Sequence, residues 1–238
     1  MVLEKIDYQE LEVKIGYQFE NIGLLKQALT HSSFNNEQRI NRVGDYERLE
    51  FLGDAVLELV SSEFLFSTYP TLPEGELTKM RASMVCEPAL AFCARDLELG
   101  KYLRLGKGED MTGGRERDSI IADVCEAIIG AIYLDGGMES AKKHIYRFIL
   151  SDLEDKQLFY DSKSNLQELV QGKLKQDITY VLLSEEGPEH NKVFKVSVLI
   201  GKEEYGRGTG RTKKAAEQQA AYSALLLLRD KGYVFKKH

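Results

Sequence analysis

The sequence predicts a multidomain protein in which an all-α domain is followed by an α+β domain with the element order α-β-β-β-α. Up to residue 160 the apolar residues recur at helical spacing, whereas in Phe194–Ile200 they recur at every second position. The charge balance also changes sign, because residues 1–160 carry 18 Lys+Arg against 28 Asp+Glu and residues 161–238 carry 14 against 10. We therefore expect an all-helical domain over 1–154, a linker over 155–163 and the α+β domain over 164–231.

The elements of the first domain follow from apolar spacing, capping residues and prolines. A polar loop is expected over Phe34–Asp45, and Pro70 ends the helix that follows it. Gly100–Asp118 is rich in glycine and charge, which indicates a flexible segment. The predicted helices lie within 8–30 and at Tyr46–Val60, Leu77–Cys86, Ala89–Leu97, Ile120–Tyr133 and Met138–Leu153.

The helix predicted over Tyr46–Val60 has acids on one narrow arc and apolar residues around most of its circumference. The acids are Glu47, Glu50, Asp54 and Glu58, and the apolar residues are Leu49, Leu52, Ala55, Val56, Leu59 and Val60. Such a helix is expected to be mostly buried, so that its carboxylates lie at the rim of a core, where an unpaired charge is costly. A divalent cation would compensate them, although for a single such helix a solvated acidic stripe is the better explanation.

The segment Ala122–Gly137 repeats this arrangement and favours the cation. Asp123 and Glu126 lie three residues apart on one face, and Gly130 follows one turn later on that face. Two such helices can bring four carboxylates together, and oxygen ligands of this kind suit Mg²⁺ or Mn²⁺ rather than zinc.

The second domain is expected to contain a helix, three strands and a helix. These are Asn165–Lys175, Tyr180–Leu183, Phe194–Ile200, Glu203–Gly210 and Thr212–Arg229.

The composition limits the class of protein. No apolar run approaches the roughly 18 residues that a membrane span needs, and the N-terminus is too charged for a signal peptide. Cys86, Cys93 and Cys125 form no zinc or disulfide pattern. We therefore expect a cytoplasmic protein that is not associated with a membrane.

Two motifs carry a resemblance to a known family. YERLEFLGDAVLEL resembles the signature helix of bacterial ribonuclease III, and ADVCEAIIGAIYLDGG resembles the second acidic helix of that family. The similarity extends from about Tyr8 to Leu228, and the segment Gly208–Glu217 resembles the second-helix entry of the double-stranded-RNA-binding domain. The resemblance implies a homodimeric, Mg²⁺-dependent endoribonuclease that also accepts Mn²⁺ and needs no other cofactor.

The same resemblance implies the products, substrates and site residues. Glu50, Asp54, Asp123 and Glu126 would be the catalytic residues and metal ligands, with Asp54 and Glu126 set most deeply among apolar neighbours. Cleavage of double-stranded RNA would leave 5′-phosphate and 3′-hydroxyl ends with two-nucleotide 3′ overhangs, and ribosomal, messenger and transfer RNA precursors would be processed. Thr30–Ser33 also matches a family segment, in which we favour a structural role for His31.

The RNA contacts are assigned by the same motifs. A-form RNA exposes 2′-hydroxyls in its minor groove and phosphates across its major groove. Lys213 and Lys214 lie at a helix N-terminus, which favours phosphate. The other positions matched to RNA contacts are Ser164, Gln167, Glu168 and His190 in the second domain and Glu47 and Glu74 in the first. For Glu47 a role beside the metal ligands, and for Glu74 the stabilisation of a helix start, remain open.

One position departs from the family pattern. Ala215 stands where a Glu often completes a capping box, which removes about 1 kcal/mol at most from the helix end.

Two other functions remain open from the residues: a non-catalytic double-stranded-RNA-binding protein that retains the fold, and a phosphohydrolase of small molecules. The four acids argue against the first and the RNA-binding domain argues against the second.

Overall fold

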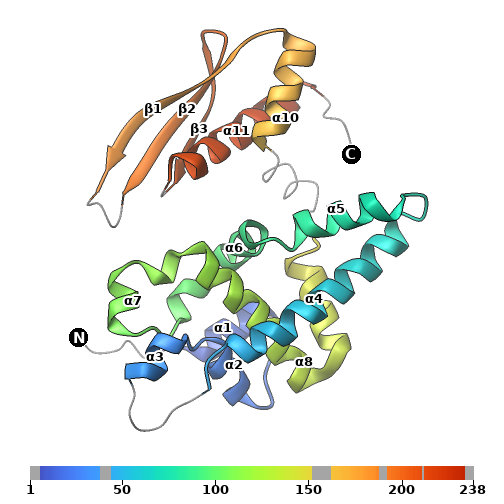
Figure 1. Cartoon of the computed structure of the whole chain (residues 1–238), viewed down its shortest axis with the longest axis vertical. Coiled ribbons are helices and arrows are strands. Elements are labelled where there is room, and N and C mark those ends of the chain that lie inside the picture. The colour runs from blue at the N-terminus through green and yellow to red at the C-terminus, as the bar shows by residue number, and fades with distance from the viewer. Residues whose placement is uncertain (1–5, 38–43, 152–161, 188–191, 211, 234–238) are drawn as a thin grey trace. The chain divides into compact units, whose positions relative to one another are not determined.

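The computed structural model describes residues 6–37, 44–151, 162–187, 192–210 and 212–233. The chain divides into two compact units, Met1–Leu153 and Glu154–His238 (Figure 1). Each unit has its own buried apolar core.

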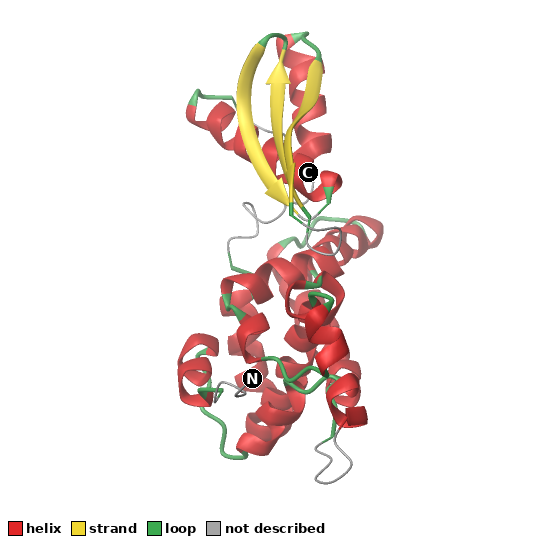
Figure 2. Cartoon of the chain, turned by 90° about the vertical axis from the view of Figure 1, so that its left-hand side faces the viewer, coloured by secondary structure: helices red, strands yellow, loops and turns green. Residues whose placement is uncertain are grey.

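The described part of the first unit consists of helices, with one isolated parallel bridge between Thr30 and Arg104 and no strand (Figure 2). This confirms the all-α prediction. In chain order the elements are α1 (Tyr8–Ile15), α2 (Ile22–Ala28), α3 (Ser32–Glu37), α4 (Glu47–Thr68), α5 (Glu74–Met84), α6 (Glu87–Asp96), η1 (Leu99–Tyr102), α7 (Lys107–Met111), η2 (Gly114–Glu116) and α8 (Asp118–Phe148).

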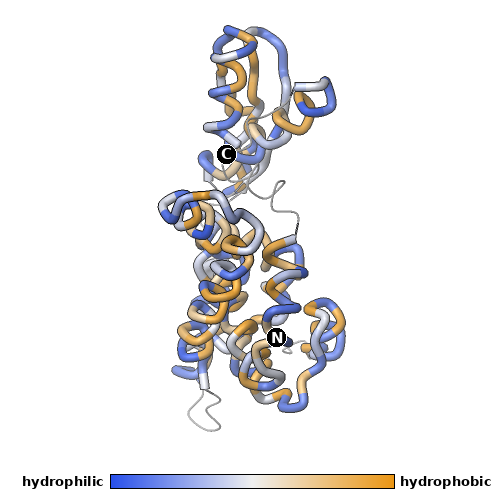
Figure 3. The backbone as a smooth tube through the Cα atoms, turned by 90° about the vertical axis from the view of Figure 1, so that its right-hand side faces the viewer, coloured by the Kyte–Doolittle hydropathy of each residue, from blue (hydrophilic) through white to orange (hydrophobic). Residues whose placement is uncertain are grey.

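Helix α8 runs through the core of this unit and packs against α4, α6 and α2. Its first half is buried almost all round, as the exposed fractions of the consecutive residues Ala127, Ile128 and Ile129 (0–1%) show, because their side chains point about 100° apart around the helix. Gly137 takes φ 75° and ψ −177°, which is not a helical conformation, and so divides α8 into two helical segments. This break lies between the two helices that the sequence predicted, Ile120–Tyr133 and Met138–Leu153. Apolar and polar residues alternate along the helices of this unit (Figure 3).

One loop prediction in this unit was wrong in part and another was wrong. The first four residues of the predicted loop Phe34–Asp45 belong to α3, whose start is fixed by the Ser33 N–H donating to Nδ1 of His31 at 3.1 Å. Residues 38–43 lie outside the described residues, and Gly44 and Asp45 are in neither a helix nor a strand, as predicted. The segment Gly100–Asp118 contains short helices in place of a flexible loop. Arg115 fixes it by donating to the carbonyl oxygens of Gly100 and Leu103 at 3.2 and 2.7 Å.

The second unit has the predicted order of a helix, three strands and a helix. Its elements are α10 (Ser162–Leu169), the π-helical turn η3 (Val170–Leu174), β1 (Ile178–Glu186), β2 (Val193–Ile200), β3 (Glu203–Gly210) and α11 (Lys213–Asp230). The antiparallel sheet has the order β1-β2-β3, with a bulge between Leu182 and Ser184. Both α10 and α11 lie on one face of it (Figure 1).

Close contact between β3 and α11 depends on small residues. A Cβ added at Gly208 would lie 2.2 Å from the carbonyl oxygen of Ala216, and one at Gly206 would lie 2.4 Å from that of Ala220. The G-x-G spacing of the strand and the Ala spacing of the helix therefore fit one another.

The predicted linker falls largely on residues 155–161, which lie outside the described residues. Ser162 and Lys163 belong to α10, because the Ser162 side chain is buried and donates to the carbonyl oxygen of Gln218 at 2.9 Å. Among the helices that the structure describes, none is long and apolar enough to cross a membrane.

Candidate active site and RNA-binding surface

The two acidic helices meet at a glycine crossing. A Cβ added at Gly53 of α4 would lie 1.8 Å from the carbonyl oxygen of Glu126, and one at Gly130 of α8 would lie 2.2 Å from that of Leu49. The two backbones thus touch where both side chains are hydrogen atoms. Glu50 lies one turn before Gly53 and Glu126 one turn before Gly130, so the crossing places both acids on the same side.

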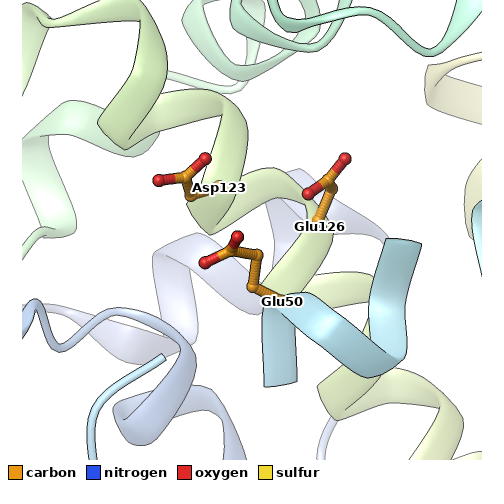
Figure 4. A group of neighbouring side chains, drawn as sticks. All are labelled: Glu50, Asp123 and Glu126. Carbon is orange, nitrogen blue, oxygen red and sulfur yellow. The ribbon is translucent and has the colours of Figure 1, made fainter. Parts of the chain in front are cut away.

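The structure brings Glu50, Asp123 and Glu126 together. One carboxylate oxygen from each lies within 4.8 Å of the others. Figure 4 shows Glu50 extending from α4 toward the two acids of α8. All three donors are oxygens, which fits a hard cation such as Mg²⁺ or Mn²⁺.

The local environment disfavours negative charge on these side chains. Burial and, to a smaller extent, the neighbouring carboxylates of Asp54, Glu50 and Asp123 together raise the pKa of Glu126 to about 8. Burial likewise raises the pKa of Glu50 to about 7, with contributions from Asp123, Glu47 and Asp54. The charged groups that raise the pKa of these two acids are all carboxylates, so a bound cation would relieve the repulsion between them.

Asp54 does not join the group of three. Its side chain is exposed, so the prediction that Asp54 is among the most deeply set acids was wrong. The reason is that none of the described residues covers the outer face of α4. Phe51, Ala55 and Leu59 are exposed on that helix as well, which also contradicts the prediction of a mostly buried helix. The Asp54 charge nevertheless acts on Glu126.

Asp123 has a partner that sequence analysis missed. The hydroxyl of Tyr46 donates to Oδ2 of Asp123 at 3.4 Å, and burial followed by the charges of Asp123 and Glu50 raises the pKa of that hydroxyl far above its usual value. Burial raises the pKa of Asp123 and the hydrogen bond from Tyr46 lowers it, with smaller effects from Glu87, which raises it, and His31, which lowers it. Residue spacing in the sequence could not predict this contact, because Tyr46 and Asp123 are 77 residues apart.

The other acids of the first unit matched to RNA contacts are exposed. Glu47 lies in the first turn of α4, and its charge raises the pKa of Glu50. Glu74 begins α5 and accepts a hydrogen bond from the Thr78 hydroxyl at 2.9 Å. Its side chain thus stabilises the first turn, and it stays accessible to solvent.

In the second unit the polar candidates lie on accessible faces. Ser164, Gln167 and Glu168 are exposed on α10, on the side opposite to the buried Ser162, Leu166 and Leu169.

Lys213 and Lys214 are exposed in the first turn of α11, where Thr212 caps the helix by accepting from the Ala215 N–H at 3.1 Å. His190 lies outside the described residues.

The comparisons with known proteins match both units. The Ribonuclease-III-like family matches residues 21–153, and the double-stranded RNA binding motif matches residues 162–228. The chain is 50% identical to Ribonuclease 3 of Shouchella clausii over 230 residues, which cover 96% of this chain and 88% of that protein. It is 50% identical to Ribonuclease 3 of Oceanobacillus iheyensis over 222 residues, covering 92% and 97%.

This chain is also similar to a solved structure of the nuclease domain of ribonuclease III from Campylobacter jejuni. That structure is described as showing flexibility in a region involved in dimer formation. It has 43% sequence identity and a TM-score of 0.56, and the match covers 60% of this chain and 96% of that domain. Fold, acidic cluster and relatives therefore agree: the chain belongs to the ribonuclease III family, the endonucleases of double-stranded RNA.

Proposed function

We propose that the chain is a Mg²⁺-dependent enzyme that hydrolyses double-stranded RNA to 5′-phosphate and 3′-hydroxyl ends with two-nucleotide 3′ overhangs, with Mn²⁺ able to substitute. The observation that carries this proposal is the convergence of Glu50, Asp123 and Glu126 within 4.8 Å, on a chain that also has a double-stranded RNA binding motif. By family resemblance, the substrates are ribosomal and other structured precursor RNAs in the cytoplasm.

The carboxylates would act as a unit. Glu50 from α4 and Asp123 and Glu126 from α8 would hold the cation, and Asp54, one turn after Glu50, would complete the set from the solvent side. When bound, the cation would activate water and stabilise negative charge on the scissile phosphate. Cation binding requires that Glu50 and Glu126 lose the protons that their raised pKa values retain near neutral pH.

The RNA would be held by both units. Lys213 and Lys214 add positive charge where free N–H groups of α11 already favour phosphate. Ser164, Gln167 and Glu168 offer hydrogen-bonding groups for minor-groove 2′-hydroxyls, and His190 would contribute from the β1–β2 connection. Glu47 and Glu74 would contact the substrate beside the cluster.

A homodimer would give one catalytic site for each strand. The exposed face of α4 supports this, because Phe51, Leu59 and Phe66 are 80%, 58% and 75% exposed at helical spacing. A second copy packed on this face would bury a stripe that the chain itself leaves open.

The test is cleavage of a perfect duplex RNA in Mg²⁺ or EDTA by the wild type and Glu126→Gln, with gel mobility of the same RNA measured in parallel. The proposal is supported if the wild type cuts the RNA only with Mg²⁺ and Glu126→Gln no longer cuts the RNA but still shifts it in the gel. Binding without cutting by the wild type in either Mg²⁺ or Mn²⁺ would overturn it in favour of a non-catalytic RNA-binding protein. Free nucleotides serve as the comparison substrate for a phosphohydrolase of small molecules.

A further inference from the structure

Tyr46 links the two helices that carry the acidic cluster. Its carbonyl oxygen accepts from the backbone N–H of Leu49 and of Glu50, both at 2.8 Å, and so fixes the first turn of α4. Its hydroxyl reaches α8, donating to Asp123 Oδ2 at 3.4 Å. One residue thus contacts the backbone of one cluster acid and the side chain of another.

The ring of Tyr46 is held in place from a third segment. The Tyr46 N–H donates to the carbonyl oxygen of Thr30 at 2.9 Å, and the imidazole of His31 lies with its centroid 5.6 Å from the phenol ring. The side chain is 4% exposed. Buried between these groups, the ring has little freedom, so the direction of its O–H bond toward Asp123 is set by the fold.

We infer that Tyr46 is a positioning residue of the metal site: by holding one oxygen of Asp123, its hydroxyl keeps this carboxylate turned toward Glu50 and Glu126. The inference rests on the proposed metal role of those acids. Partners of this kind orient ligands and tune their affinity for the metal. At 3.4 Å the hydrogen bond is long, so the expected effect is at the lower end of the range for such partners.

The test is Tyr46→Phe, which removes only the hydroxyl, with Tyr17→Phe as the matched control. Tyr17 belongs to the same unit and also donates its hydroxyl to an aspartate, Asp135, at 2.8 Å, but it has no part in the cluster. Mn²⁺ binding is measured without RNA, from the electron paramagnetic resonance signal of the free ion. We expect the dissociation constant to rise on the order of tenfold in Tyr46→Phe and to stay unchanged in Tyr17→Phe.

A second readout separates positioning from general damage. In Tyr46→Phe the Mg²⁺ concentration for half-maximal RNA cleavage should rise, while the rate at saturating Mg²⁺ stays close to the wild-type rate. Unchanged Mn²⁺ affinity, equal losses in both Tyr→Phe variants, or a lower saturated rate without a shift in Mg²⁺ dependence would each overturn the inference.

Asp123→Asn distinguishes this inference from the function on which it rests. If the wild type binds Mn²⁺ and Asp123→Asn binds it weakly while Tyr46→Phe binds it normally, the metal site stands and the role of Tyr46 fails. If Asp123→Asn binds Mn²⁺ as the wild type does, the proposed metal role of the cluster fails, and the role of Tyr46 fails with it.

Discussion

Within the acidic cluster, folding brings together side chains that repel one another. Glu126 has a pKa raised to about 8 and Glu50 one raised to about 7, first by burial and then by neighbouring carboxylates. Without a cation, these two acids therefore hold protons near neutral pH that they would lose in the unfolded chain. The two carboxyl groups are therefore stable in their protonated form. They become metal ligands when a cation displaces the protons.

This repulsion gives a pH dependence that Glu126→Gln should remove. Because the pKa of Glu126 is about 8 in the folded state against 4.5 for an unperturbed glutamate, the folded state binds more protons than the unfolded state between those values. The free energy of unfolding therefore falls as pH rises through that window. In EDTA at pH 9, Glu126→Gln should be more stable than the wild type by about 2 kcal/mol, after a discount for solvent screening.

Urea unfolding from pH 4 to pH 9 measures this difference, which should vanish at pH 4. Excess Mn²⁺ should reverse the order at pH 8, since a cation that binds only the folded wild type stabilises it. Equal stabilities of the two proteins at pH 9 would contradict the raised pKa.

At the scale of elements, the crossing of α4 and α8 sets the geometry of the site. Neither helix could approach so closely with a larger residue at Gly53 or Gly130, since an added Cβ would lie 1.8 or 2.2 Å from a backbone carbonyl oxygen. Backbone cannot move aside as a flexible side chain can. The helices would have to separate, and the distance between Glu50 and Glu126 would grow with them.

Gly53→Ala should therefore destabilise the first unit and weaken metal binding together. Overpacking of this kind costs about 1–3 kcal/mol, which outweighs the gain of about 1 kcal/mol that Ala brings to a helix interior. Gly75→Ala is the matched control, because Gly75 is also helical and an added Cβ there meets nothing within 4 Å. Urea unfolding and Mn²⁺ binding test both variants. A Gly53→Ala protein as stable as Gly75→Ala would show that the crossing tolerates a methyl group.

Periodicity predicted which residues share a face of a helix, and it did not predict what covers that face. From periodicity we predicted the helices that carry Glu50, Asp123 and Glu126 and the acidic face of each helix, together with the element order of the second unit. It missed the exposure of Asp54 and Leu59, because whether a face is buried depends on neighbours distant in the chain. The bond from Tyr46 to Asp123 and the anchoring of 100–118 by Arg115 also join residues whose proximity arises only on folding.

At the scale of the whole molecule, the two units would have separate roles, one catalytic and one in RNA binding, in each copy of the proposed dimer. The first unit carries the acidic cluster, and the second carries a basic helix end and an excess of basic over acidic residues, 14 against 10 over residues 161–238. Connecting a binding unit to a catalytic one makes the second contact with RNA intramolecular, which raises its effective concentration.

The proposed dimer should depend on the exposed face of α4. Replacing both Phe51 and Leu59 with Ser removes apolar surface that a second copy would bury, and should convert the protein to a monomer with little change in monomer stability, since both side chains are exposed. Val13→Ser in α1 is the control, because Val13 is 80% exposed, as Phe51 is, and lies on another helix. Sedimentation velocity measures the outcome. A double variant that remains dimeric would place the interface elsewhere.

Binding of RNA by the second unit should depend on where its positive charge lies. Replacing Lys213 and Lys214 with Ala removes two charges from the start of α11, so the affinity for duplex RNA should fall on the order of tenfold, and the slope of log K against log salt should decrease by about 2. The control variant replaces Lys202 and Lys231 with Ala. It removes the same amount of charge from the β2–β3 turn and the end of α11. Gel mobility over a range of salt concentrations separates a specific contact from net charge, because equal losses in the two double variants would mean that net charge alone attracts the RNA.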